Sequence, residues 1–206
     1  MLHLGAIAQV VPLVAAAAAR RRVRGARAWV LAWCGLLVVV DGAALWLGYH
    51  GTSNIVLFNL ATPAGPALVL WALAYWQAGD LSKLTFRLAI VPFLLVWGVL
   101  TFAFESTSSF SSVAGPLTKL VGLGAATFTL LAGSRRVEGM LHCRDWFWIS
   151  GGMALYFGAA AALSPLSALL VGETPQLVVR AYEVKSVLDV FAFLAIARGV
   201  TCPVET

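Results

Sequence analysis

Charged residues are scarce in this chain of 206 residues, where Asp, Glu, Lys and Arg together make up 11% of the sequence. A typical soluble domain carries about 25% charged residues, so this composition excludes an ordinary soluble fold. Hydrophobic residues make up 61% instead, and the mean hydropathy is +0.89. Apolar runs of about 20 residues, the length that crosses a bilayer, recur along the whole chain. The sequence therefore predicts a multi-pass protein whose main partner is the lipid bilayer.

Potential metal ligands and catalytic groupings are equally sparse. The sequence has three cysteines, Cys34, Cys143 and Cys202, and its three histidines, His3, His50 and His142, lie far apart along the chain. Without a Cys/His cluster we predict neither a metal site nor a disulfide framework. No nucleophile stands beside a base, and no carboxylates are paired at a fixed spacing. We therefore name no catalytic residue and do not favour an enzymatic activity, although the sequence leaves one open.

Seven apolar segments define the expected architecture. The connectors between them are mostly shorter than about a dozen residues, which leaves no room for a soluble domain. The whole chain, 1–206, is therefore expected to form one all-α membrane domain, a seven-transmembrane-helix bundle with short loops. The expected helices span about 2–19, 28–49, 54–76, 84–104, 111–133, 146–171 and 176–198.

Positive charges lie on one set of alternating connectors. Five arginines follow the first expected helix, Lys83 and Arg87 lie around the start of the fourth, and Arg198 ends the seventh. The other connectors contain no Lys or Arg: 50–54, 105–112 and 171–176. The positive-inside rule then places the N-terminus outside the cell (inner) membrane and the C-terminus in the cytoplasm. The net charge of +5 follows from this topology, so we do not expect nucleic acid as a partner.

The third expected helix contains two prolines three residues apart, Pro63 and Pro66. Each lacks a backbone donor, so together they are predicted to kink or open the helix. Carbonyl groups freed there need partners, which Asn59, Thr62 or water can supply. Such an opening either lines a cavity or only shapes the bundle.

The seventh apolar segment carries four charged residues: Arg180, Glu183, Lys185 and Asp189. A charge left alone in mid-membrane costs roughly 2.5–3.5 kcal/mol on insertion scales, so these side chains must pair or face a polar interior. Arg180 and Glu183, at i,i+3, are predicted to form a structural ion pair nearer the outer interface. Lys185 and Asp189, at i,i+4, lie deeper and are predicted to line an interior site.

Two other helices carry ionisable residues at depth, and they are the expected neighbours of that interior site. Asp41 lies at the centre of the second helix, and Lys119 lies about a third of the way into the fifth. Proton relays and substrate paths in membranes use such residues. We predict a polar site that binds, senses or transports a small solute, an ion or protons, formed by Asp41, Lys119, Glu183, Lys185 and Asp189 with Asn59 and Tyr156.

One fragment of the seventh helix resembles microbial rhodopsins, which hold retinal on a lysine of their last helix. The segment LDVFAF, 188–193, is similar to the family's LDVSAK, with Asp189 at the position of the counterion acid. The third helix also shares a TP dipeptide with the family's TTP. The chain departs from the pattern because Phe193 stands at the position of the retinal lysine and Lys185 lies one turn before the acid. The resemblance implies a retinal photoreceptor using Lys185 as one alternative; otherwise no cofactor is expected.

A second resemblance concerns the fold alone. The segment FWISGGMALYF, 147–157, and the short loops resemble a group of uncharacterised small bacterial seven-helix membrane proteins. This resemblance spans about helices two to seven and implies no activity. A further alternative is a non-enzymatic scaffold or assembly subunit, whose charges pair within the bundle or with a membrane protein partner.

Overall fold

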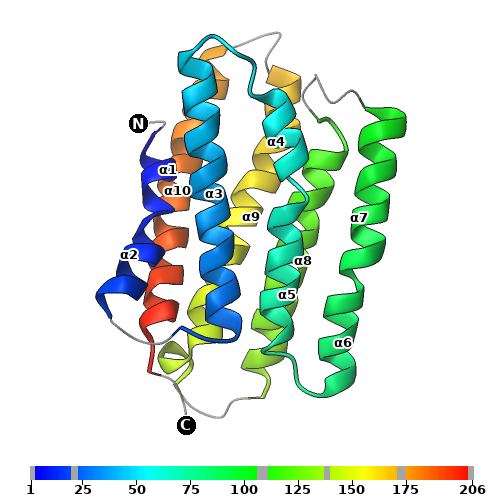
Figure 1. The fold of residues 1–206 in the computed structure, drawn as a ribbon. Helices are drawn as coiled ribbons and strands as arrows, with labels where there is room; N and C mark the ends of the chain where they lie inside the picture. The colour runs from blue at the N-terminus through cyan, green and yellow to red at the C-terminus, as the bar shows by residue number, and fades with distance from the viewer. Residues whose placement is uncertain (1–2, 20–22, 106–110, 137–139, 171–174, 204–206) are drawn as a thin grey trace.

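The computed structural model describes the chain except residues 1–2, 20–22, 106–110, 137–139, 171–174 and 204–206. All regular structure in the described residues is helical, and the helices run up and down in one elongated bundle (Figure 1). The elements are α1 (His3–Ala8), α2 (Val11–Ala18), α3 (Ala26–Tyr49), α4 (Ile55–Ala61), α5 (Ala64–Ala74), α6 (Asp80–Leu88), α7 (Ile90–Val99), a π-helical turn (Leu100–Phe104), α8 (Ala114–Ser134), a 3-10 turn (Leu141–Cys143), α9 (Asp145–Leu170) and α10 (Pro175–Thr201).

Prolines explain why three of the expected helices are divided. Proline has no N–H group, and its ring clashes with the carbonyl four residues earlier, so the helix is interrupted there. The break between α1 and α2 precedes Pro12, and the break between α6 and α7 precedes Pro92. The break between α4 and α5 falls at Pro63, just before Pro66, where the sequence predicts an opening. The first expected helix, 2–19, is therefore two short helices rather than one.

Five helical stretches are long and apolar enough to cross a membrane: Ala26–Tyr49, Ile55–Ala74, Asp80–Phe104, Ala114–Ser134 and Asp145–Leu163. A sixth stretch, Leu4–Ala18, is apolar but shorter. α10 has 27 residues and carries the charged positions discussed above. These findings confirm the all-helical prediction and the presence of several membrane-length apolar helices.

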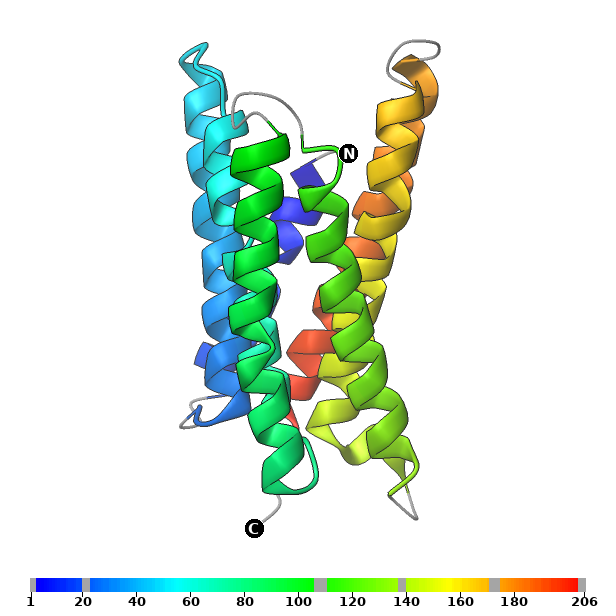
Figure 2. The same cartoon turned by 90° about the vertical axis from the view of Figure 1, so that its right-hand side faces the viewer.

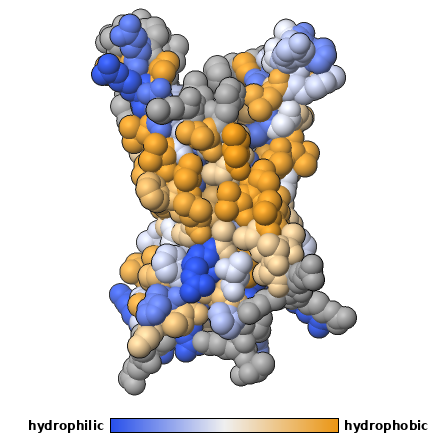
Figure 3. All heavy atoms as spheres, turned by 90° about the vertical axis from the view of Figure 1, so that its left-hand side faces the viewer, coloured by the Kyte–Doolittle hydropathy of each residue, from blue (hydrophilic) through white to orange (hydrophobic). Residues whose placement is uncertain are grey.

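The apolar side chains also gather where a bilayer would contact them. On the face shown in Figure 3, hydrophobic residues dominate the middle of the molecule and hydrophilic residues gather toward its two ends. Many large apolar side chains on this bundle are exposed, including Val39 at 68% and Leu95 at 65%. Such a surface is that of a multi-pass membrane protein rather than of a soluble bundle.

The core lies where α3, α9 and α10 meet. The ring of Trp33 on α3 stacks on Phe157 of α9 at 5.7 Å and on Phe193 of α10 at 6.0 Å, measured between centroids. α9 and α10 approach closely because Gly152 has no side chain. A Cβ atom at that position would lie 2.6 Å from the backbone oxygen of Ala192. The core thus fixes these three helices relative to one another.

The bundle is wider at one end than at the other. In Figure 2 the upper parts of α9 and α10 diverge from α3 and α4, whereas α9 and α10 approach α3 toward the lower end. The short helices α1 and α2 pack along α10. The cavity described next is lined by side chains from both of the diverging groups of helices.

Candidate functional site

A cavity of about 450 Å³ lies within the bundle, and its lining comes from helices far apart in the sequence. Residues of α1, α3, α4, α8, α9 and α10 line it, as does a residue between α1 and α2. Five of the seven residues predicted to form the site are among them: Asp41, Lys119, Tyr156, Lys185 and Asp189. The structure therefore places most of the predicted ionisable groups around one space.

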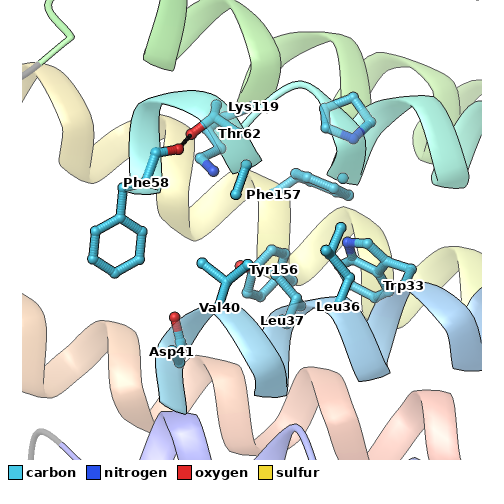
Figure 4. Close-up of a pocket in the computed structure, with 13 residues that line it drawn as sticks. Trp33, Leu36, Leu37, Val40, Asp41, Phe58, Thr62, Lys119, Tyr156 and Phe157 are labelled. Atoms are coloured by element: carbon cyan, nitrogen blue, oxygen red, sulfur yellow. Dashed lines mark hydrogen bonds between the residues drawn. The ribbon is translucent and has the colours of Figure 1, made fainter. Parts of the chain in front are cut away.

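A smaller space of about 100 Å³ adjoins the first and shares Asp41, Lys119 and Tyr156 with it. Figure 4 shows Lys119 on one side of this smaller pocket and Asp41 on the other, with the Tyr156 ring between them. The aromatic rings of Trp33 and Phe157 also line this smaller space. We use "the cavity" for the two spaces together.

Lys185 and Asp189 form an ion pair on one face of α10. The Lys185 Nζ atom donates to Asp189 Oδ2 at 2.5 Å, across one helical turn. The Asp189 side chain is buried, and its Oδ1 atom accepts no hydrogen bond from the described residues. Gly5 of α1 lies so close that a Cβ atom there would be 3.1 Å from Asp189 Oδ2. The Lys185 ammonium also lies 5.2 Å from the centroid of the Tyr156 ring, a cation–π distance.

Asp41 is held by Gln9, a residue outside the predicted site. Gln9 lies at the break between α1 and α2, and its Nε2 atom donates to Asp41 Oδ2 at 2.7 Å. The Gln9 side chain is buried, and its Oε1 atom has no partner among the described residues. The break before Pro12 explains this placement, because it turns the chain where Gln9 meets α3. The sequence does contain a signal for Gln9. It is a polar amide side chain within four residues before a proline, Pro12, in an otherwise apolar segment.

Lys119 differs from the other charged residues of the cavity. It makes no hydrogen bond or ion pair with any residue that the structure describes. Its side chain is only partly exposed and lines both spaces of the cavity. A cation in such a position favours an anion or a polar solute as a partner, because a buried charge without compensation is costly.

Two predicted site residues lie elsewhere. Among the described residues, neither Asn59 nor Glu183 lines the cavity. The predicted structural ion pair between Arg180 and Glu183 is also absent from the described part of the chain. Arg180 is exposed near the start of α10, where pairing of an accessible charge gains little free energy.

For the retinal alternative, the relevant position is Phe193, which stands where microbial rhodopsins have the retinal lysine. Phe193 is fully buried, and its ring centroid lies 5.5 Å from that of Tyr156.

Comparisons with protein families, curated proteins and solved structures give no match. The resemblances to microbial rhodopsins and to small bacterial seven-helix proteins therefore stay predictions, as does retinal binding.

A second buried polar cluster, at the opposite end of the bundle, was not predicted. The Arg27 guanidinium on α3 donates from Nε to Asp145 Oδ2 of α9 at 2.9 Å. Its terminal nitrogens donate to three backbone oxygens at the end of α10, those of Val200, Cys202 and Pro203. We call this cluster the Arg27 clamp. Arg27 is the last of the five arginines that follow the first expected helix, and the sequence predicts for these only a role in setting the topology.

Proposed function

We propose that this chain is an integral protein of the cell (inner) membrane that crosses it seven times. The five membrane-length stretches would be joined by α1–α2 as the first span and by α10 as the last. The ends of α2, α5, α8 and α10, which the basic connectors and the C-terminal residues follow in the sequence, lie toward the lower end of the bundle in Figure 1. The positive-inside rule assigns that end to the cytoplasm and leaves the N-terminus outside.

Within that membrane domain, the cavity is proposed to bind and transport a small polar solute, an ion or protons. One observation supports this most strongly: Asp41, Lys119, Lys185 and Asp189, on three different helices, line a single cavity. Ionisable groups inside a membrane are expensive and usually belong to substrate or proton paths. The cavity also retains buried acceptor atoms without protein partners, Asp189 Oδ1 and Gln9 Oε1. A structural network would be expected to satisfy these atoms internally.

The two interrupted spans beside the cavity support the same proposal. Gln9, at the break between α1 and α2, lines the cavity, and so does Thr62, at the break between α4 and α5. Interrupted helices are tolerated in membranes where they line a polar space, and transporters use them at substrate sites. A scaffold would need neither the breaks nor the cavity. We therefore prefer transport to the scaffold alternative.

Flux through reconstituted vesicles tests the proposal. The protein and two variants are placed in liposomes, and proton uptake is followed with an entrapped pH dye under an imposed gradient. Uptake of radiolabelled anions and zwitterions is measured in parallel. We expect Asp189→Asn to abolish the flux that the unmodified protein supports. Asp80→Asn is the matched control, because Asp80 is exposed on α6 and lies outside the cavity.

The contrary outcome is equally defined. If Asp189→Asn and Lys185→Met insert normally and leave every measured flux unchanged, the cavity is not a transport path. Co-purification of a stoichiometric membrane protein partner with an inactive cavity would then favour the scaffold alternative.

A further inference from the structure

A second group of unused donors lies outside the cavity, where α5 and α6 pack together. Arg87 is in the last turn of α6. Its guanidinium carbon lies 4.8 Å from the centroid of the Trp71 ring and 5.4 Å from that of the Tyr75 ring. Trp71 and Tyr75 are four residues apart on α5 and the turn that follows it, so their rings lie on one face. The two rings hold the guanidinium by cation–π contacts.

These contacts leave the hydrogen-bonding capacity of the group unused. Arg87 Nε and Trp71 Nε1 are both buried and have no acceptor among the described residues. Arg87 is also in no ion pair within the described part of the chain, and Asp80 of the same helix pairs with Lys83 at 3.3 Å instead. A guanidinium with free N–H groups matches the oxygens of a phosphate in a bidentate arrangement. The tryptophan N–H adds a further donor beside it.

The surroundings of Arg87 are suited to a lipid. α6 presents three exposed leucines on one stripe, Leu81 at 79%, Leu84 at 50% and Leu88 at 57%. Trp29, itself partly exposed, packs against Trp71 at 5.8 Å between ring centroids. Aromatic rings with a polar edge are typical of the interface between headgroups and acyl chains. An apolar stripe for acyl chains therefore lies on the same short helix as the free guanidinium.

We infer that Arg87, Trp71 and Tyr75 form a binding site for the phosphate of an anionic phospholipid. The guanidinium and the indole N–H would bind the phosphate oxygens, and the leucine stripe of α6 would contact the acyl chains. Arg87 lies in the last turn of α6, where α6 meets α7 in the lower half of Figure 1, and so in the half of the bundle that carries Lys83 and Arg135. Basic surfaces attract the anionic lipids of the cytoplasmic leaflet. This inference does not depend on the transport proposed for the cavity.

Lipid-dependent thermal stability tests the site. The delipidated protein in a neutral detergent is melted with added phosphatidylglycerol, phosphatidylcholine or inorganic phosphate. A ligand that binds only the folded state raises the melting temperature. We expect phosphatidylglycerol to raise it in the unmodified protein, and Arg87→Gln to remove that rise. Arg135→Gln changes an exposed arginine at the same end of the bundle, and this variant should keep the rise in melting temperature. Trp71→Phe, which preserves a ring but removes the N–H donor, should reduce it.

Three results would overturn the inference. An undiminished rise in Arg87→Gln would exclude this residue as the site. An equal rise with phosphatidylcholine would exclude recognition of an anionic headgroup, and a full rise with inorganic phosphate alone would assign the site to a free anion. If Arg87→Gln does not fold, native mass spectrometry decides the question. The unmodified protein should then retain phosphatidylglycerol in preference to phosphatidylcholine, and Trp71→Phe should retain less.

Discussion

The Arg27 clamp and the cavity are two polar clusters held by the same helices, α3, α9 and α10, and they differ in how completely their charges are satisfied. In the clamp, each nitrogen of the Arg27 guanidinium donates to an oxygen. The partner, Asp145, uses its other oxygen to accept from the backbone N–H of Trp146 at 2.7 Å. In the cavity, Asp189 Oδ1 and Gln9 Oε1 have no described partner, and Lys119 has none either.

This difference separates a structural role from a binding role. A buried ion pair whose every donor and acceptor is satisfied fixes the position of the chain segments that it joins. An incompletely satisfied group beside a cavity raises the free energy of the folded state unless solute or water completes its bonds. The clamp therefore joins three helix ends, and the cavity retains groups that are available to a ligand. Substitutions in the clamp should therefore lower the stability of the fold, and substitutions in the cavity should chiefly lower flux.

The largest expected effect is the loss of the clamp. Arg27→Met removes the cation and leaves Asp145 and three backbone oxygens without their donor. Breaking a buried ion pair in this way typically destabilises by about 3–5 kcal/mol. Unfolding of the purified protein in mixed detergent micelles measures the change. Arg24→Met is the control, because Arg24 is exposed and three residues away, and its stability should stay near that of the unmodified protein. Equal losses in the two variants would refute a special role for Arg27.

The next effect concerns the close contact that holds α9 against α10, between the two clusters. Gly152→Ala would place a methyl group 2.6 Å from a backbone oxygen of α10, so the helices must separate. Overpacking of this kind costs about 1–3 kcal/mol. Gly151→Ala is a matched control, because a Cβ atom there meets nothing within 4 Å. Its stability should be unchanged or higher, since alanine favours a helix by up to about 1 kcal/mol over glycine. The same unfolding assay compares the two, and equal stabilities would contradict the close packing.

Much of the cavity could be predicted from the sequence because a bilayer restricts where a charge can lie. Asp41, Lys119 and Asp189 occur in apolar segments, so each must turn toward the interior, and an interior shared by a few helices brings them together. The opening at Pro63 could likewise be predicted, since a missing N–H acts locally. Gln9 was not predicted because the first segment was interpreted as one continuous helix. Pro12 divides that segment, and only the division brings Gln9 to Asp41.

The clamp could not be predicted for a different reason. An arginine in a basic connector serves equally well as a cytoplasmic anchor or as a buried donor, and the local sequence is the same in both cases. Its partner, Asp145, is 118 residues away. Whether the two meet depends on how the ends of α3, α9 and α10 pack. The Arg180–Glu183 ion pair was predicted from the sequence but is absent from the described residues. Spacing of i,i+3 permits an ion pair and does not require one.

Replacing Lys119 is expected to change stability less than replacing Arg27, and any change should be a gain rather than a loss. Lys119→Met removes a cation that has no described hydrogen-bond or ion-pair partner, so stability should stay within about 1 kcal/mol of the unmodified protein or rise. Flux through the cavity should be lost in the same variant, because the free cation faces the space. The unfolding assay and the vesicle assay are therefore run on one preparation. A loss of stability as large as that of Arg27→Met would show that Lys119 is structural, and the contrast between the clusters would fail.

The smallest effect is expected at Glu105, a third polar cluster that joins the π-helical turn to the start of α8. Burial raises the pKa of this carboxyl, but hydrogen bonds from Ser111, Ser112 and the N–H groups of Val113 and Ala114 outweigh it, so the pKa lies below its ordinary 4.5. A group with a lowered folded-state pKa stabilises the protein above its unfolded-state pKa, and this contribution is lost as the pH falls through the folded-state value.

Melting temperatures recorded from about pH 7 down to about pH 3 should therefore fall less steeply below pH 4.5 in Glu105→Gln than in the unmodified protein. Asp80→Asn serves as the control, because Asp80 is exposed and its ion pair with Lys83 contributes little. The effect is small because Glu105 is itself partly exposed. Identical acid profiles for Glu105→Gln and the unmodified protein would show that the hydrogen bonds of this carboxylate do not contribute measurably to stability. Stability at this end of the bundle would then come from helix packing, whereas the Arg27 clamp would still hold the opposite end.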